Sequence, residues 1–245
     1  MNIFSAIILG IIQGLTEFLP VSSSGHLVLA QSLIPGFNQP GIFFDVILHA
    51  GTLVAVTAYF WKKILKISKK QIILLIIGTI PAVILGLLFN DLFEESFSNV
   101  KAVGIQLIIT GILCWLIDRA NTTKKSISIF DSFLIGIGQA IAIIPGISRS
   151  GSTIFAAVFR GINRAEAAEF SFFLSIPAIA GAIVLQTLKH GGSSQIDPVF
   201  YFVGFITSLI FGFLSIKILI NMLKSKQFKY FGVYCFILGG LAVLV

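Results

Sequence analysis

Two oxygen-bearing side chains near the start of the chain could bind a cation. Gln13 and Glu17 are four residues apart, so on a helix they share one face and can direct two oxygen atoms to one point. Carboxylate and carbonyl oxygens are the ligands that hard cations prefer, which predicts Mg²⁺ or Ca²⁺ rather than zinc. The alternative interpretation is structural: Glu17 forms a salt bridge with Arg149, and Gln13 only joins packed helices.

A serine-rich turn with a histidine follows directly. The segment Ser22–His26 comes after Pro20, which favours a broken helix whose tip offers hydroxyls and free backbone N–H groups. Such a tip is typical of anion binding and makes Ser24 a candidate substrate ligand. His26, which we expect to lie at membrane depth and to face a carboxylate, could act as general acid, general base or nucleophile. Small residues also let membrane helices pack closely, so the serines have a structural interpretation as well.

A second cluster of hydroxyl side chains surrounds Arg149. Prolines and glycines break the helical pattern between Pro145 and Thr153. A guanidinium donates hydrogen bonds in a planar fork that matches phosphate oxygens. With the hydroxyls of Ser148, Ser150 and Thr153 beside it, Arg149 is predicted to hold an anion. The segment has no GxxxxGK[ST] pattern, which excludes a P-loop.

Asp45 and His49 form a further pair at helical spacing. They lie four residues apart at one end of an apolar stretch, so they share a helix face. One interpretation is that they orient the groups of the site. The other is a partly solvated pair at the membrane surface.

The elements that must position these residues belong to a membrane protein. Of the 245 residues 56% are hydrophobic and 11% charged, and the mean hydropathy is +1.01, whereas a soluble domain is ~25% charged. Two apolar regions, about 1–35 and 131–163, are broken by the clusters just described, and we expect them to be re-entrant helical hairpins. Six further stretches are long enough to cross a hydrocarbon layer ~30 Å thick: 41–60, 71–90, 102–118, 169–188, 199–221 and 229–245. The predicted class is an all-α polytopic membrane protein.

The charges predict how the chain is oriented. In the six-span arrangement, fourteen of the seventeen Lys and Arg residues fall on one side, which places that side in the cytoplasm and both termini outside. Lys101 and Lys189 fall on the other side, beside the acidic residues Asp91, Glu94 and Glu95. This asymmetry accounts for the net charge of +7, so we expect no nucleic-acid partner.

The two broken regions resemble each other. A shift of 126 residues aligns them without a gap, and five pairs of small or polar residues coincide: Gly10 with Gly136, Gln13 with Gln139, Ser22 with Ser148, Ser24 with Ser150, and Gly25 with Gly151. We therefore expect one integral membrane domain, 1–245, built from repeats at about 1–120 and 127–245. Since each repeat holds an odd number of crossings, the second copy is inverted, and the two polar tips meet near the centre of the bilayer.

These motifs resemble a known family. Residues 13–27 (QGLTEFLPVSSSGHL) are similar to the (E/Q)xxxE motif and serine-rich turn of the bacterial undecaprenyl-diphosphate phosphatases associated with bacitracin resistance, and residues 145–153 (PGISRSGST) match their PGxSRSxxT signature. Residues 44–56 (FDVILHAGTLVAV) are also similar to a segment of that family. The resemblance covers essentially the whole chain. Some members carry Glu where this chain has Gln13, which leaves Glu17 as the one certain carboxylate of the motif.

The resemblance implies a function. Such a hydrolase removes the terminal phosphate of undecaprenyl diphosphate with a divalent cation, and so recycles the lipid carrier of cell-wall synthesis in the bacterial plasma membrane, with the site open to the outer face. By the same resemblance, Glu17 and Gln13 bind the metal, and Arg149, Ser148 and Thr153 hold the diphosphate. His26 and Ser22 or Ser23 are left for proton transfer and attack.

Several alternatives stay open at this stage. A transporter or flippase of polyprenyl phosphate could use the same inverted repeat and anion-binding cluster, with or without hydrolysis. A membrane scaffold is a third interpretation. The residues do not distinguish a serine, His26 or a water molecule as the nucleophile, and they leave the oligomeric state open, a homodimer included.

Overall fold

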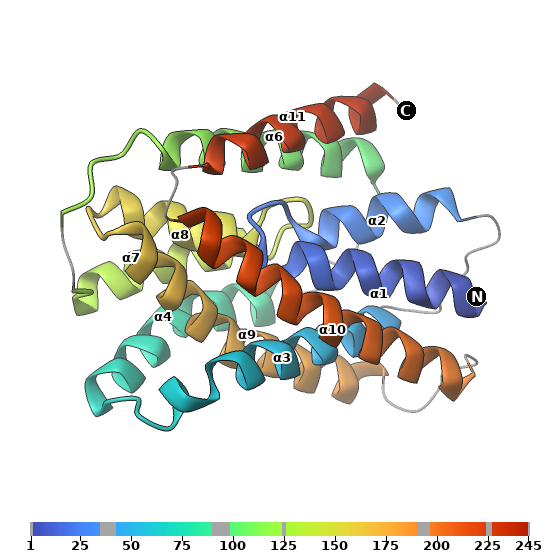
Figure 1. Ribbon diagram of the computed structural model, residues 1–245, viewed down its shortest axis with the longest axis horizontal. Helices are drawn as coiled ribbons and strands as arrows, with labels where there is room; N and C mark the ends of the chain where they lie inside the picture. Colours follow the sequence, from blue (N-terminus) through green and yellow to red (C-terminus); the bar gives the residue numbers. More distant parts are fainter. Residues whose placement is uncertain are drawn as a thin grey trace.

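The chain folds into helices throughout the part that the structure describes. This computed structural model describes residues 2–34, 43–89, 99–123, 126–190, 197–223 and 227–244. The helices of these ranges, shown in Figure 1, are α1 Ile3–Phe18, α2 Ser23–Leu33, α3 Phe43–Ile64, α4 Lys69–Leu88, α6 Val100–Ile117, α7 Ile129–Ile141, α8 Arg149–Phe159, α9 Arg164–His190, α10 Pro198–Leu223 and α11 Phe228–Leu244. The predicted all-α class is confirmed.

Five helices in the described ranges are long and apolar enough to cross a membrane: α3, α4, α6, α9 and α10. They coincide with five of the six predicted spans. The remaining segment, 229–245, forms α11, which has 17 residues. At 1.5 Å per residue this helix is about 25 Å long, the lower limit for a hydrocarbon layer ~30 Å thick. The protein is therefore a multi-pass membrane protein, and its sixth crossing stays a prediction.

The two broken regions form helix–turn–helix pairs. Helices α1 and α2 have 16 and 11 residues, and α7 and α8 have 13 and 11. None of the four is long enough to cross the hydrocarbon layer alone. The predicted breaks therefore lie where the sequence placed them, between 18 and 23 and between 141 and 149. The re-entrant path of each pair stays a prediction.

A serine fixes the start of the second helix in each pair. Ser22 caps α2 by accepting a hydrogen bond from the Gly25 N–H at 3.3 Å, and Ser148 caps α8 by accepting one from the Gly151 N–H at 3.1 Å. These caps satisfy N–H groups that a helix start leaves unpaired. Ser22 has a φ of 69°, a conformation that residues with a side chain rarely adopt. The first turn therefore stores strain on the order of 1–3 kcal/mol.

Helices that are distant in sequence pack closely. Figure 1 shows α6 beside α11, and further contacts join α1 to α10, α10 to α3 and α4 to α7. Glycines allow this proximity: a Cβ added to Gly104 would lie 2.8 Å from the Gly239 oxygen, and one added to Gly136 would lie 2.5 Å from the Gly78 oxygen. Close backbone approach at small residues is how membrane helices commonly associate, because hydrocarbon gives them no hydrophobic driving force.

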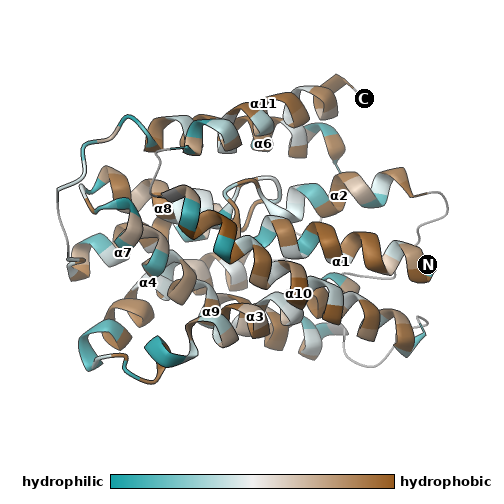
Figure 2. Cartoon of the chain, in the orientation of Figure 1, coloured by the Kyte–Doolittle hydropathy of each residue, from teal (hydrophilic) through white to brown (hydrophobic). Residues whose placement is uncertain are grey.

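The outer surface is apolar. Large hydrophobic side chains are exposed along α4, among them Ile76, Ile80, Ile84 and Leu88. Figure 2 shows hydrophobic residues along most of the helices and a hydrophilic segment around the turn between α3 and α4. A patch of this extent is unfavourable in water but is the expected exterior in lipid.

The predicted orientation rests partly on charged residues that lie outside the described residues. These are the basic residues Lys124, Lys125, Lys224 and Lys226 and the acidic residues Asp91, Glu94 and Glu95.

The packing of α3 against α10 gives a test of the fold. A Cβ added to Gly51 would lie 2.1 Å from the Ser208 oxygen and 2.4 Å from the Phe205 carbonyl oxygen. Gly51→Ala should therefore destabilise the protein by about 1–3 kcal/mol, because the two helices must move apart. Thermal unfolding in detergent measures the change. Gly240→Ala is the matched control, since no neighbouring atom of the described residues lies within 4 Å of its added Cβ. Equal melting temperatures of the two variants would contradict this packing.

Candidate active site

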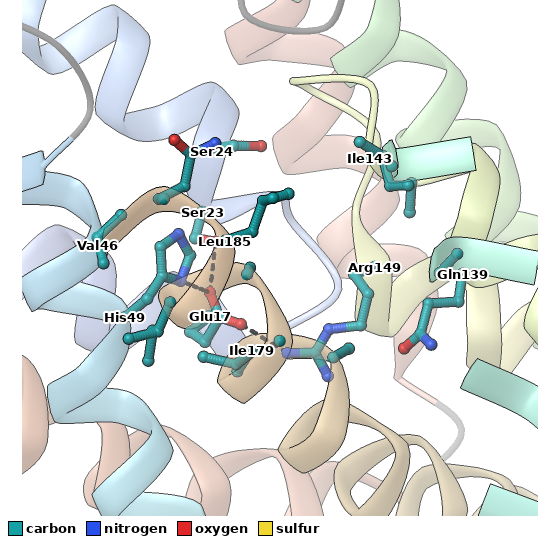
Figure 3. A pocket seen from close by; sticks show the side chains of 18 of the residues that line it. Glu17, Ser23, Ser24, Val46, His49, Gln139, Ile143, Arg149, Ile179 and Leu185 are labelled. Carbon is teal, nitrogen blue, oxygen red and sulfur yellow. Dashed lines mark hydrogen bonds and ion pairs between the residues drawn. The ribbon is translucent and has the colours of Figure 1, made fainter. Parts of the chain in front are cut away.

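Glu17 is the centre of a buried polar cluster. Its carboxylate accepts hydrogen bonds from Arg149 Nη2 at 2.5 Å, Ser23 Oγ at 2.7 Å and Gln13 Nε2 at 2.9 Å. Its side chain is 5% exposed and that of Arg149 15%. Figure 3 shows the carboxylate between Arg149 on one side and Ser23 and His49 on the other. The structure thus brings together the acid of α1 and the guanidinium of α8, as the sequence predicted.

His49 takes part in this cluster directly. Its Nδ1 atom lies 2.8 Å from Gln13 Nε2 and 3.3 Å from Glu17 Oε2. Because an amide nitrogen can only donate, the shorter contact makes Nδ1 an acceptor from Gln13. Asp45, one turn before His49 on α3, accepts a hydrogen bond from Gln31 Nε2 at 2.8 Å. His49 therefore touches the central carboxylate itself, whereas Asp45 ties α3 to α2.

The position of His26 differs from the expectation. The sequence suggested an imidazole that faces the buried carboxylate, but Nδ1 of His26 lies 2.7 Å from the Ser22 carbonyl oxygen and Nε2 lies 2.8 Å from the Tyr234 hydroxyl. The ring stacks on Tyr234 with 5.5 Å between centroids. The cause is that His26 lies on the side of α2 that meets α11. The histidine beside Glu17 is His49, and the proposed proton-transfer role of His26 stays a prediction.

The second turn is held by residues that its motif does not contain. The Ser148 N–H donates to Thr110 Oγ1 at 2.9 Å, and this hydroxyl donates to the Gly146 carbonyl oxygen at 2.9 Å. Arg149 Nη1 reaches the carbonyl oxygen of Ser171 at 3.5 Å. Thr110 and Ser171 are fully buried, on α6 and α9. Neither was predicted from the sequence: Thr110 is the one hydroxyl residue of α6, and Ser171 is one of three in α9, with Ser175 and Thr187.

The hydroxyls predicted to bind substrate fall into two groups. Those of Ser150 and Thr153 are bonded inside the protein, to the Leu19 carbonyl oxygen at 2.9 Å and to Ser171 Oγ at 2.7 Å. Neither side chain is among the described residues that line the cavity, and their predicted contact with substrate stays a prediction. Ser23, Ser24 and Ser148 do line it. The two turns also contact each other, since the Gly146 N–H donates to Ser24 Oγ at 3.4 Å.

A cavity of about 410 Å³ adjoins the polar cluster. One end is polar and is lined by Glu17, the serines of the first turn, His49, Ser148 and Arg149. Gln139, which the repeat pairs with Gln13, lies on the wall beyond Arg149 in Figure 3. The other end is mostly apolar, and its walls come mainly from two helices, from Thr79, Ala82, Val83, Gly86 and Leu87 of α4 and from Pro177, Ala178, Ile179, Gly181, Ala182, Ile183 and Leu185 of α9. Leu27, Val46, Ala142, Ile143, Ile147 and Gln186 also line the cavity.

The polar end has oxygen ligands for a divalent cation. Gln13 Oε1 is buried and has no hydrogen-bond partner in the described part of the chain, and Glu17 is an adjacent carboxylate. Within the described residues there is no group of three or more His, Cys, Asp or Glu side chains that could hold a metal ion. Mg²⁺ is commonly bound by one or two carboxylates together with substrate phosphates, so these residues fit a cation that a phosphorylated ligand helps to hold.

Fold and site together define a polytopic helical membrane protein with a buried ion pair at the end of an apolar cavity. Comparison with known proteins gives the family. The model of the family described as bacitracin resistance protein BacA matches residues 6–241. The chain therefore belongs to the BacA family, which the resemblance of its two motifs predicted.

Relatives match over nearly the whole chain. A protein named undecaprenyl-diphosphatase from Carboxydothermus hydrogenoformans is 42% identical over 98% of this chain and 95% of its own length. Undecaprenyl-diphosphatase 4 of Bacillus cereus is 44% identical over the same shares. The undecaprenyl-diphosphatase of Halothermothrix orenii is 42% identical over 100% of this chain and 98% of its own.

The buried ion pair can be tested by a double-mutant cycle. Glu17→Gln and Arg149→Gln should each destabilise the protein by about 3–5 kcal/mol, because either leaves a buried charge without a partner. The double variant should lose clearly less than the sum. Thermal unfolding in detergent measures the coupling. The control pair is Lys63 and Glu169, whose side chains are 55% and 35% exposed and whose coupling should be about 0–1 kcal/mol. Additive effects at Glu17 and Arg149 would contradict the pairing.

Proposed function

We propose that the protein hydrolyses undecaprenyl diphosphate to undecaprenyl phosphate and inorganic phosphate, and so recycles the lipid carrier of cell-wall synthesis in the bacterial plasma membrane. The observation that carries the proposal is the Glu17–Arg149 pair at the polar end of a cavity whose other end is apolar. A diphosphate on a polyprenyl chain has the same division into an anionic and an apolar part. The relatives that bear the name of this enzyme support the assignment.

Arg149 and two helix starts bind the diphosphate. The guanidinium can form paired hydrogen bonds to phosphate oxygens. Helices α2 and α8 both begin at the cavity, where Ser23, Ser24 and Ser148 line it. The N-terminal end of a helix carries a partial positive charge and favours anions. The transition state of phosphoryl transfer spreads negative charge over the phosphate oxygens, so groups fixed in this way can stabilise it.

A divalent cation, Mg²⁺ or Ca²⁺, is part of the proposal. Glu17 and the unpartnered oxygen of Gln13 would hold it together with the diphosphate. When bound, the cation would neutralise charge on the phosphates. His49 would keep the amide of Gln13 oriented, because its Nδ1 accepts from the amide nitrogen and leaves the oxygen free.

Ser23 is the attacking group that the geometry favours. Its hydroxyl donates to Glu17 at 2.7 Å, so the carboxylate can take the proton as the oxygen bonds to the terminal phosphorus. Undecaprenyl phosphate leaves as the bond from phosphorus to the bridging oxygen breaks, and water then releases phosphate from the serine. The Ser22 hydroxyl instead caps α2. His26 and a water molecule are the other two nucleophiles that the sequence left open.

The finer membrane arrangement also belongs to the proposal: six spans, two re-entrant hairpins and an inverted repeat, with the basic turns in the cytoplasm and both termini and the site on the outer face. Matching local geometry supports the repeat. In both turns the capping serine lies 3.2 Å from the serine two residues later. The packing is reciprocal as well, since α1 contacts α10 while α7, its counterpart after a shift of 126 residues, contacts α4.

A carrier or flippase of polyprenyl phosphate is not favoured, because the relatives are named as diphosphatases. The homodimer stays a proposal about assembly alone. The site does not require a second copy, since its acid, guanidinium and hydroxyls all come from one chain.

Phosphate release tests the reaction and its cation. Purified protein in detergent should release inorganic phosphate from undecaprenyl diphosphate, and a chelator should abolish the release until Mg²⁺ or Ca²⁺ is restored. Arg149→Lys should lower kcat by about 10²–10³-fold, because an ammonium does not reproduce the planar donors that stabilise the developing charge. Full activity in chelator would remove the cation from the mechanism.

Trapping of a phosphorylated protein tests the nucleophile. Rapid acid quenching with a substrate labelled in the terminal phosphate should leave label on the wild-type chain, and Ser23→Ala should abolish the label. Ser22→Ala and His26→Ala are the comparison variants. Label that survives in Ser23→Ala and disappears in His26→Ala would assign the attack to the histidine, and absence of label throughout would assign it to water.

A further inference from the structure

The glycines inside the helices are of two kinds. At most of them, such as Gly14, Gly51 and Gly204, an added Cβ would lie less than 3 Å from a neighbouring helix, so close packing explains the residue. Among the described residues, no atom of a neighbouring element lies within 4 Å of a Cβ added to Gly181 of α9, and at Gly86 of α4 the one such atom is in Ile143, at 3.7 Å. A glycine inside a helix is unfavourable relative to alanine. Packing does not account for Gly181, Gly86 or Gly240 of α11, and of these three only Gly181 and Gly86 line the cavity.

Both glycines line the apolar end of the cavity. Their neighbours on its walls are also small: Ala82 precedes Gly86 by one turn on α4, and Ala178 and Ala182 flank Gly181 on α9. The same cavity reaches Glu17 and Arg149 at its polar end. Small residues on both walls therefore leave a slot that is continuous with the ion pair.

The slot also meets the outer surface of the helices. Val83 and Leu87 of α4 line the cavity and are 49% and 62% exposed, and Gly181 is exposed on α9. The exposed face of α4 is apolar and faces lipid. A hydrocarbon chain could therefore lie in the slot while the rest of it stayed in the bilayer. At about 410 Å³ the cavity is at the small end for a ligand site, so it has room for the head group and the nearest part of a long chain.

We propose that the slot between α4 and α9 holds the isoprene units next to the diphosphate, and that Gly181 and Gly86 determine which lipid chains fit. The inference rests on the proposed function and extends it to the apolar part of the substrate. The occupant is the substrate's own chain, because only a lipid with an anionic head group can fill the slot and contact Arg149 at once. A branched polyprenyl chain is wider than a straight acyl chain, and side chains smaller than leucine on both walls give it that width.

Filling the slot should weaken lipid binding and leave the head-group site as it is. Gly181→Leu adds four carbon atoms to a space in which no neighbouring atom of the described residues lies within 4 Å of the Cβ position. One methylene group in an apolar pocket changes specificity by about 10–200-fold. We therefore expect the KM for undecaprenyl diphosphate to rise by about tenfold in Gly181→Leu, and by less in Gly181→Ala and Gly86→Ala.

The experiment compares a ligand with a tail and one without. KM for undecaprenyl diphosphate and the inhibition constant of inorganic diphosphate are measured at one fixed detergent concentration for the wild type and the three variants. A raised KM with an unchanged inhibition constant supports the slot. The alanine variants keep the test decisive if Gly181→Leu does not fold, because alanine favours helix over glycine. The matched control is Gly240→Leu on α11, where the added Cβ also has no neighbour within 4 Å in the ranges that the structure describes and where both constants should stay at the wild-type values.

Two results would overturn the inference. If KM stays at the wild-type value in folded Gly181→Leu or in both alanine variants, the chain does not lie between α4 and α9. If KM and the inhibition constant rise together, Gly181 affects the head-group site instead. Either result leaves the proposed function intact as long as the wild type is active. A wild type that releases no phosphate in the presence of cation would contradict the function itself, and the slot with it.

Discussion

The ion pair between Glu17 and Arg149 is the constraint on which the rest of the site depends. A charge in an apolar environment without a partner is unfavourable by several kcal/mol, so each of these groups requires the other. They are 132 positions apart in the sequence. Closing the pair therefore joins the end of α1 to the start of α8 and fixes two broken helices relative to each other. Ion pairs of this kind add little net stability because burial of both charges opposes their attraction. The contribution of the pair is to fix the positions of the two broken helices relative to each other.

The two turns that carry the site are held in position by hydroxyl groups that do not line the cavity. Ser150 bonds to the backbone beside the first turn, Thr153 and Ser171 bond to each other, and Thr110 holds two backbone groups of the second turn. In hydrocarbon, an irregular turn must satisfy its backbone groups within the protein. Other hydroxyls of the two motifs lie at the cavity, those of Ser22, Ser23, Ser24 and Ser148, and of these Ser22 and Ser148 also cap a helix. A motif that is rich in serine serves both needs with one residue type.

The sequence predicted the features that are costly to place in a membrane. A lone Glu and a lone Arg in apolar stretches, each beside a helix break, were enough to predict that Glu17 and Arg149 meet. Five membrane-crossing helices followed from length and hydropathy alone. The contacts of His26 could not be predicted, because its partner Tyr234 lies 208 positions away in a helix with no distinguishing pattern. The apolar walls of the cavity could not be predicted either, because nothing in the sequence distinguishes Gly86 and Gly181 from the glycines at which helices pack closely.

The ion pair between Glu17 and Arg149 also limits which anions can bind in the cavity. Before a ligand binds, the charge of Arg149 is balanced by Glu17, so neither of these two charges lacks a partner in the cavity. A phosphate that binds the guanidinium must compete with the carboxylate for it, and the carboxylate then needs a new positive partner. A divalent cation that arrives with the diphosphate would meet that need, because it balances the phosphates and the freed carboxylate together. An anion without a cation would leave a buried negative charge, which the surrounding hydrocarbon opposes. The electrostatics of the closed pair thus favour a ligand that brings head group, cation and apolar chain together.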